Sequence, residues 1–369
     1  MAFRLSAFYC AFFAHAGAFV AYFPLYLAGR GFDPAQVAWV LALPPLARIV
    51  APPFWGWVAD RSGAHRAVVV MSCAVTALCF AAMPFTQHIA LLIALMSLLS
   101  SGALPIVEAI TLGSLAGQSG RYGPIRVWGS VGFIAVVLGG GLWLDYRPVS
   151  TLPAVLVFFM LATFAVALAL PPSKEKIREK AEPVRFTPAA RAVCAAGFCN
   201  AVAHGALYAF LSIHLEALGY SATSIGMLWT LGVLAEIAVF FYLPQLFRRF
   251  ALSTLLVFSL ASGTVRFLAI GWAAELLWVV LLAQLLHAAT FGSFHAAAVA
   301  AVHRVFPQGA QARGQTWFSG ISYGAGAAAG FVLSGWAWQG GGAQSAFTVS
   351  AMAAAAGALF AGRLKRAGL

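Results

Sequence analysis

Long apolar segments recur along the whole chain, and they constrain its fold more than any other feature. A helix needs about 20 predominantly apolar residues to cross the hydrocarbon core of a bilayer. Twelve segments are long enough, at residues 5–28, 34–58, 67–86, 89–117, 125–144, 149–171, 190–215, 222–247, 252–272, 275–303, 314–338 and 343–362. Of the 369 residues, 62% are hydrophobic and only 9% are charged, which excludes an ordinary soluble domain. The sequence therefore predicts an all-α polytopic membrane protein with twelve transmembrane helices.

The basic residues are divided unevenly between the loops that join these segments. One set of alternate loops, together with the two termini, holds seventeen Lys and Arg, whereas the other set holds only Arg30 and Arg147. Loops rich in Lys and Arg stay in the cytoplasm. We therefore expect a multi-pass inner (plasma) membrane protein with both termini and the 172–189 linker in the cytoplasm. The net charge of +12 reflects this topology, because the basic residues do not cluster on a soluble domain as nucleic-acid binding would require.

The only long polar connection, "PPSKEKIREKAEPVRFTP" at residues 171–188, divides the twelve segments into six and six. It predicts an N-terminal half at 1–171, a cytoplasmic linker at 172–189 and a C-terminal half at 190–369. A shift of 188 positions aligns Gly31 with Gly219 and Arg48 with Glu236. Parallel six-helix repeats of this kind are typical of secondary transporters, whose sites lie near the midplane where the repeats meet.

The loop between the second and third segments reads "GWVADRSGAHR". Its spelling G-x-x-x-D-R-x-G-x-x-R resembles the signature loop of the major facilitator superfamily. The resemblance implies a cytoplasmic gate, closed in the outward-facing state, that is formed by Gly56, Asp60, Arg61, Gly63 and Arg66. The equivalent loop of the second half, "LPQLFRRF", keeps only two adjacent arginines.

A second stretch, "YGPIRVWGSVGF" at 122–133, resembles the start of helix 5 in the phenylpropionate permease family and, more distantly, in lactose permease. Both relatives keep an acidic residue in helix 4 at the same separation from the arginine. Here that residue is Glu108, where the phenylpropionate family typically has aspartate. Residues 204–250, 263–271 and 285–297 are also similar to this family, so that the resemblance covers nearly the whole chain.

Five charged side chains fall inside the predicted spans, namely Arg48, Glu108, Arg126, Glu236 and Arg266. Such side chains cost about 2.5–3.5 kcal/mol each on insertion scales and normally face the bundle interior or a cavity. We identify Glu236 as the principal candidate for protonation, coupled to Arg266 and His295, because a proton-coupled carrier needs a shielded group that changes charge. His287 and Glu108 complete the predicted proton-coupling group. The alternative is a permanent ion pair between Glu236 and a buried arginine that only fixes helix packing.

For the substrate, we expect Glu108 and Arg126 to flank the binding site. A surplus of buried arginine favours a carboxylate ligand, because guanidinium binds carboxylate through two parallel hydrogen bonds. Aromatic residues, 14% of the chain, would cover the apolar part of such a ligand. The other candidate contacts are Arg48, Tyr22, Trp128, His204, Tyr208 and Trp229.

Several classes of function are disfavoured. The chain has no HExxH and no G-x-S-x-G motif, so we do not expect an enzyme. His287, His295 and His303 are eight residues apart, a spacing that drifts by roughly 80° on an α-helix and argues against a shared metal site. All five cysteines lie inside predicted spans without metal-ligand spacing, and no cofactor is expected.

The sequence and the resemblance together predict a secondary active transporter, a proton-coupled symporter of a small aromatic carboxylate that works by alternating access. The alternatives are a proton-coupled sugar or nucleoside symporter, or an efflux antiporter, of the same fold. A non-transporting sensor or assembly factor is the rival from another class. The resemblance also implies a monomer.

Overall fold

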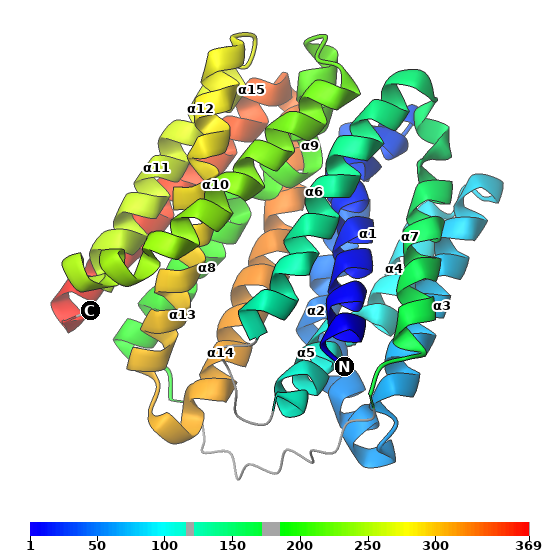
Figure 1. The fold of residues 1–369 in the computed structure, drawn as a ribbon. Coiled ribbons are helices and arrows are strands. Elements are labelled where there is room, and N and C mark those ends of the chain that lie inside the picture. The colour runs from blue at the N-terminus through cyan, green and yellow to red at the C-terminus, as the bar shows by residue number, and fades with distance from the viewer. Residues whose placement is uncertain (116–121, 172–184, 369) are drawn as a thin grey trace. The chain divides into compact units, whose positions relative to one another are not determined.

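The computed structural model describes residues 1–115, 122–171 and 185–368, and these residues are helical almost throughout, with no β-strand (Figure 1). Most of the predicted 172–189 linker lies outside the described residues. Before the linker the α-helices are α1 (Ala2–Gly29), α2 (Pro34–Ser62), α3 (His65–Ala82), α4 (Ile89–Ser100), α5 (Ala103–Ser114), α6 (Tyr122–Tyr146) and α7 (Leu152–Ala167). After it they are α8 (Pro188–Ala203), α9 (Gly205–Ala217), α10 (Ala222–Arg249), α11 (Leu252–Ala273), α12 (Leu277–Leu285), α13 (Phe294–Val305), α14 (Gln311–Ser319) and α15 (Ala327–Gly362).

Two π-helical turns interrupt the second half of the chain. One, η4 (Ala288–Ser293), joins α12 to α13, and the other, η6 (Gly320–Gly326), joins α14 to α15. Short 3₁₀ turns occupy Met83–Phe85, Val149–Thr151, Gln308–Ala310 and Arg363–Ala367. A π-helix carries an extra residue in its turn and is frequent at functional sites. The sequence did not predict either turn.

The helices of the described part form eleven segments long and apolar enough to cross a membrane. The last of them, Gln311–Lys365, has 55 residues and would rise about 80 Å as one helix, more than twice the thickness of the hydrocarbon core. Its backbone leaves the helical conformation at Gly341 and Gly342. The break divides this segment into two spans, so that the count agrees with the twelve predicted.

By its internal contacts the chain divides into two compact units. Unit 1 comprises Met1–Gly31, Leu46–Glu179 and Ser221–Gly226, and unit 2 comprises Phe32–Pro45, Lys180–Tyr220 and Met227–Leu369. The predicted halves differ from these units by two short segments, one at the start of α2 and one at the start of α10.

Unit 1 is built around the contact of α1 with α6. Glycines permit the approach: a Cβ atom on Gly132 would overlap the backbone carbonyl of Cys10, and one on Gly17 would lie 3.0 Å from the carbonyl oxygen of Phe133. Small residues at helix contacts are typical of membrane bundles, where backbones pack closely without a hydrophobic driving force. Unit 2 uses the same device where α15 packs on α11, since a Cβ atom on Gly271 would lie 2.7 Å from Cβ of Phe347.

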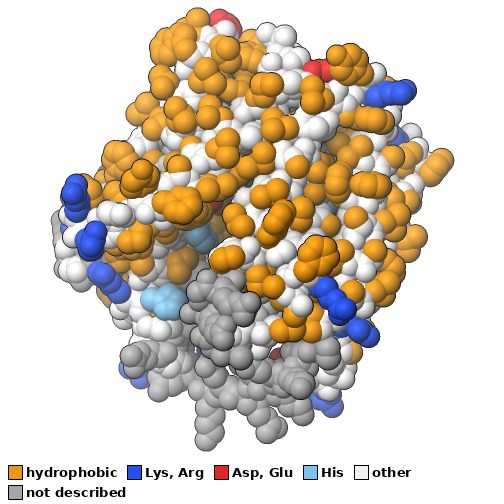
Figure 2. Space-filling view, in the orientation of Figure 1, with side chains coloured by type: hydrophobic (Ala, Val, Ile, Leu, Met, Phe, Trp, Pro, Cys, Tyr) orange, Lys and Arg blue, Asp and Glu red, His pale blue; other side chains and the backbone are white. Residues whose placement is uncertain are grey.

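The exterior is as apolar as the spans require. On the face drawn in Figure 2, hydrophobic side chains cover most of the described surface, and Lys and Arg side chains lie near its margins, at the left, the lower right and the upper right. Large hydrophobic side chains that are exposed in the isolated chain include Phe85, Phe241, Trp272 and Leu359. An exterior of this kind is suited to lipid rather than to water.

The two predicted repeats begin in the same way. α2 starts at Pro34 and α10 at Ala222, 188 positions later. Each start follows a glycine with positive φ, Gly31 at 85° and Gly219 at 86°, a backbone conformation that glycine adopts without strain. The side chain of Asp33 caps α2 by accepting from the Gln36 amide, and that of Ser221 caps α10 by accepting from the Ser224 amide. These four capping residues also match pairwise at a shift of 188.

Candidate functional site

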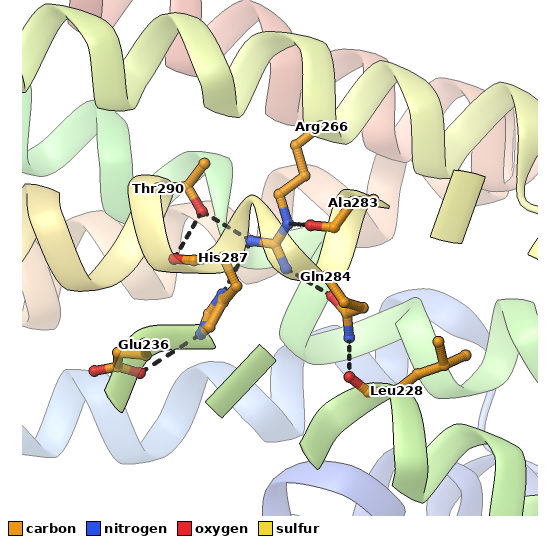
Figure 3. Close-up of polar contacts among 7 residues, drawn as sticks. All are labelled: Leu228, Glu236, Arg266, Ala283, Gln284, His287 and Thr290. Carbon is orange, nitrogen blue, oxygen red and sulfur yellow. Dashed lines mark hydrogen bonds and ion pairs between the residues drawn. The ribbon is translucent and has the colours of Figure 1, made fainter. Parts of the chain in front are cut away.

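Arg266 of α11 is fully buried in unit 2, with 1% of its surface exposed. Its Nε donates to the carbonyl oxygen of Ala283 at 2.7 Å, and Nη2 donates to Oε1 of Gln284 at 2.8 Å. Nη1 lies 3.0 Å from Nδ1 of His287 and donates to Oγ1 of Thr290 at 3.0 Å (Figure 3). All four partners come from α12, His287 and η4, and all are neutral acceptors. The guanidinium therefore lies inside a cage of dipoles, and no carboxylate lies within 4.0 Å of it among the described residues.

The contact between Arg266 and His287 determines the tautomer of the imidazole. Guanidinium can only donate hydrogen bonds, so Nδ1 of His287 must accept and the ring proton of neutral His287 lies on Nε2. Nε2 lies 3.9 Å from Oε2 of Glu236 in α10, as Figure 3 shows. His287 thus connects the buried cation on one side with the carboxylate on the other.

A side-chain hydrogen bond and a glycine contact hold α10 against the cluster of Arg266, His287 and Glu236. Gln284 uses its amide nitrogen to donate to the carbonyl oxygen of Leu228 at 3.0 Å, which ties α12 to α10. A Cβ atom on Gly292 would lie 3.0 Å from Cγ of Glu236, so glycine is needed for η4 to pass beside the carboxylate. The π-helical turn and this glycine together set the distance between His287 and Glu236.

His295 has a different place from the one predicted. Its Nδ1 lies 2.7 Å from the Tyr323 hydroxyl in η6, and no described contact joins it to Arg266. The rings of His287, Phe291 and His295 form a ladder, with centroids 5.3 and 6.3 Å apart and planes 7° and 10° from parallel. The drift of roughly 80° expected between His287 and His295 applies to an α-helix. The π-helical turn η4 lies between them and has more residues per turn, and their rings lie nearly parallel on either side of Phe291. His303 lies further along α13 and is exposed.

The three aromatic candidates of the second half lie together beside this ladder. Trp229 stacks on Tyr208 at a centroid distance of 5.9 Å, and Tyr208 stacks on His204 at 6.0 Å. The ring of His204 lies 6.0 Å from that of Phe291 and 6.3 Å from that of His287. We call His204, Tyr208, Trp229 and Phe291 the aromatic wall of unit 2.

Unit 1 holds the second predicted group. The guanidinium of Arg126 lies over the ring of Phe13 at 4.0 Å and near that of Tyr9 at 5.3 Å, distances at which a cation is attracted to a ring face. Arg126 acts electrostatically on Glu108, but the two described side chains form no ion pair within 4.0 Å. The hydroxyl of Tyr9 lies 3.2 Å from Oγ1 of Thr111, one turn from Glu108.

The other predicted substrate contacts lie apart from these clusters. Tyr22 is fully buried between α1 and α6, where its hydroxyl donates to the carbonyl oxygen of Val137. Trp128 is 48% exposed and has no ring contact with another described residue. Arg48 is exposed and has no hydrogen bond or ion pair within the described part of the chain. The sequence placed all three near one site, because a helix apolar on every side does not reveal which face is buried.

The predicted gate loop lies at the turn from α2 to α3. The carboxylate of Asp60 lies 2.9 Å from Nε2 of His65, and the guanidinium of Arg61 lies over the ring of Trp57 at 5.6 Å. Gly63 has φ of 65° and forms the turn, Gly56 has open space around it, and Arg66 is exposed. His65 was not predicted to take part.

Sequence reasoning also missed Gln284, Thr290, Phe291 and Tyr323. Gln284 and Thr290 are polar residues inside an apolar span, and this signal was available. Nothing in the sequence marks Phe291 or Tyr323, since aromatic residues at helical spacing are usually core.

Comparisons with known proteins agree with this architecture. The model of the MFS_1 like family matches residues 2–349. The chain is 30% identical over 347 residues to the "Probable 3-phenylpropionic acid transporter" of Escherichia coli (strain K12), covering 90% of this chain and 89% of that protein. It is 26% identical over 338 residues to the maltose permease of Geobacillus stearothermophilus, covering 86% of this chain and 85% of the permease.

Solved structures give the same fold. The nucleoside transporter NupG superposes with a TM-score of 0.82 at 16% identity and covers 99% of this chain and 98% of its own. The human organic anion transporter MFSD10 superposes with a TM-score of 0.65 at 18% identity, covering 98% and 99%. With the family match over nearly the whole chain and this common fold, the protein belongs to the MFS_1 like family and is a multi-pass membrane transporter of the major facilitator superfamily.

Proposed function

We propose that this transporter is a proton-coupled symporter of a small aromatic carboxylate. The observation that carries the proposal is the arrangement of Glu236, His287 and Arg266 inside unit 2. A carboxylate in a membrane span is expensive and usually functional. Here the Nε2 proton of His287 is directed at Glu236 by a hydrogen bond on the opposite side of the ring. Protonation of Glu236 would remove the charge that attracts this N–H group, and we infer that this change couples the proton to the conformational cycle.

The choice of cargo rests on unit 1. The guanidinium of Arg126 lies over the ring of Phe13 at 4.0 Å, and a guanidinium can bind a carboxylate through two parallel hydrogen bonds. The E. coli relative is named as a probable transporter of 3-phenylpropionic acid, which has this chemistry.

We further propose an inner-membrane location with both termini in the cytoplasm, in accord with the distribution of Lys and Arg. A monomer moving one solute together with protons by alternating access is the simplest form of this function.

The test is uptake of radiolabelled 3-phenylpropionate into proteoliposomes under an imposed inward proton gradient, for the natural protein and Glu236→Gln. We expect the natural protein to accumulate the acid above equilibrium and the variant to equilibrate it without accumulation. Glutamine keeps the size and polarity of the side chain but cannot exchange a proton, so it isolates the coupling step. Uphill accumulation by Glu236→Gln would remove Glu236 from the mechanism.

A second candidate is symport of a sugar or nucleoside. The 26% identity to a maltose permease favours it, and the same coupling group would serve. Accumulation of maltose or a nucleoside, in place of the aromatic acid, would support this alternative. Export of a preloaded compound against its gradient would indicate an efflux antiporter, and lack of flux for the whole panel would favour a sensor or assembly factor.

A further inference from the structure

His204 lies where α8 gives way to α9, and only one of its ring nitrogens has a partner. The side chain is 3% exposed, and Nδ1 lies 2.8 Å from the carbonyl oxygen of Asn200. A carbonyl only accepts, so Nδ1 carries the proton and Nε2 of the neutral ring is an acceptor. Nε2 is fully buried and has no hydrogen-bond partner among the described residues.

A buried acceptor without a donor is costly and rare, and each instance calls for an explanation. Two neighbouring donors, Arg266 and Trp229, already have acceptors. Arg266 gives its hydrogen bonds to α12, His287 and η4, and the indole N–H of Trp229 donates to Oγ of Ser212 at 3.1 Å. We therefore expect a bound ligand to supply the donor for Nε2 of His204.

The surroundings of His204 indicate where a ligand would approach. Tyr208 and Phe291 flank its ring at centroid distances of 6.0 Å each, and both are partly exposed whereas His204 is buried behind them. An aromatic ligand that stacks on the aromatic wall would carry its ring substituents towards His204. Among the wall residues, His204 offers an acceptor and no available donor.

We propose that Nε2 of His204 accepts a hydrogen bond from a hydroxyl group on the ring of the transported acid, so that the preferred substrates are hydroxylated aromatic carboxylates. This inference rests on the proposed function and narrows its substrate class. Stacking on Tyr208 or Phe291 supplies affinity for any aromatic ring, while His204 distinguishes rings with a donor from rings without one. A site built around a hydrogen bond disfavours the analogue that lacks the donor, because the acceptor then stays buried and unpaired.

The experiment measures inhibition of labelled 3-phenylpropionate uptake by unlabelled 3-phenylpropionate and by its 2-, 3- and 4-hydroxyphenyl analogues. We expect one hydroxyl isomer to inhibit roughly tenfold better than the unsubstituted acid, as loss of one buried hydrogen bond would require. The ratio of the affinities for the hydroxylated and unsubstituted acids is also measured by equilibrium binding to the purified protein. Binding needs only a folded site, so a variant that shows no uptake still gives a result.

Two variants of His204 form a matched pair. His204→Asn keeps an amide donor near the Nδ1 position but has no atom near Nε2, and we expect the ratio of affinities for the hydroxylated and unsubstituted acids to fall to about one. His204→Gln can place an amide oxygen near the Nε2 position and should retain part of the preference. Tyr208→Phe is the control for the other hydroxyl of the wall and should leave the preference unchanged.

Several results would overturn the inference. One is that no isomer is preferred by the natural protein, and another is that the preference survives in His204→Asn or is lost in Tyr208→Phe. If 3-phenylpropionate and its analogues show neither uptake nor binding, the proposed function fails and this inference fails with it. Normal uptake of the unsubstituted acid without any hydroxyl preference overturns the inference alone.

Discussion

Nδ1 of His287 accepts a hydrogen bond from Arg266 at 3.0 Å, and this contact directs the Nε2 proton towards Glu236. Three spans, carrying α10, α11 and the α12–α13 helix with its π-helical turn, meet at this one ring. A second proton on Nδ1 would place two donors face to face, so protonation of His287 and its contact with Arg266 exclude each other. The imidazole is therefore an orienting group between a fixed cation and a titratable carboxylate.

The two nitrogens of His287 have separable roles. In His287→Asn the side-chain oxygen can still accept from Arg266, but the N–H directed at Glu236 is lost. We expect gradient-driven accumulation of 3-phenylpropionate to fall about tenfold or more, while exchange between equal concentrations stays within about threefold of the natural rate. In His287→Gln the side-chain amide reaches the Nε2 position instead, and no acceptor remains at the Nδ1 position. This variant should unfold at a lower temperature, because an N–H group of Arg266 is then buried without an acceptor. Full accumulation by His287→Asn would contradict the orienting role.

Two glycines of α6 provide a matched test of packing in unit 1. A Cβ atom on Gly141 would lie 2.6 Å from the carbonyl oxygen of Ala222 and 2.8 Å from the Tyr22 hydroxyl, whereas one on Gly139 meets nothing within 4 Å. Gly141→Ala should destabilise the protein by about 1–3 kcal/mol, because backbone and side chain must move apart. Gly139→Ala should be neutral or stabilising by up to about 1 kcal/mol, since alanine favours the helix. Thermal unfolding in detergent checks both, and equal Tm values would refute the close approach.

Asp145 at the end of α6 holds the beginning of α10. Its carboxylate accepts from the amides of Ala222 at 2.7 Å and Thr223 at 3.2 Å, and from the Thr223 hydroxyl. A capping carboxylate is worth about 0.5–2 kcal/mol, so Asp145→Ala should speed hydrogen exchange at residues 222–226 by about 3–30-fold. Asp33→Ala removes the corresponding cap of α2 and should leave exchange at 222–226 unchanged. Mass spectrometry of peptides covering both helix starts distinguishes the two variants, and unaltered exchange in Asp145→Ala would show that the cap is not needed.

The sequence predicted the spans well because their signal is hydrophobic length, which a bilayer imposes directly. It also singled out Glu236, Arg266 and His287, which the structure brings together, since an ionisable group in an apolar span is conspicuous. It did not reveal η4, because the hydrophobic length of a span does not distinguish a π-helical turn from the α-helix on either side of it. The ring ladder of His287 and His295 could not be predicted without that turn.

The same limit applies to unit 1. Trp128 and Tyr22 are as aromatic as Tyr208, and only the packing of α1 against α6 decides that Tyr22 is buried and donates to a backbone carbonyl. The break at Gly341 and Gly342, in contrast, was implied by the length limit on a membrane helix, which separated the last two predicted spans.

Arg126 provides the most direct test of the proposed carboxylate site. Its guanidinium lies 4.0 Å from the centre of the Phe13 ring, and a Cβ atom on Gly129 would come within 2.7 Å of Nη1. Ring and glycine therefore position the guanidinium from two sides. Lysine in its place keeps the charge but neither stacks as a plane nor binds a carboxylate through two parallel hydrogen bonds. We expect Arg126→Lys to raise KM for 3-phenylpropionate about tenfold with little change in maximal rate, because ground-state binding is what the second hydrogen bond supplies.

Gly129→Ala keeps Arg126 but displaces its guanidinium. This variant should therefore also raise KM, by a smaller factor of about threefold. Phe13→Leu, which removes the ring but not the apolar volume, should behave similarly. Uptake rates measured over a range of concentrations at a fixed proton gradient give KM and maximal rate separately. An unchanged KM in Arg126→Lys, with normal uptake, would mean that the carboxylate is bound elsewhere, and an equal loss of maximal rate in all three variants would indicate a role in the conformational cycle instead.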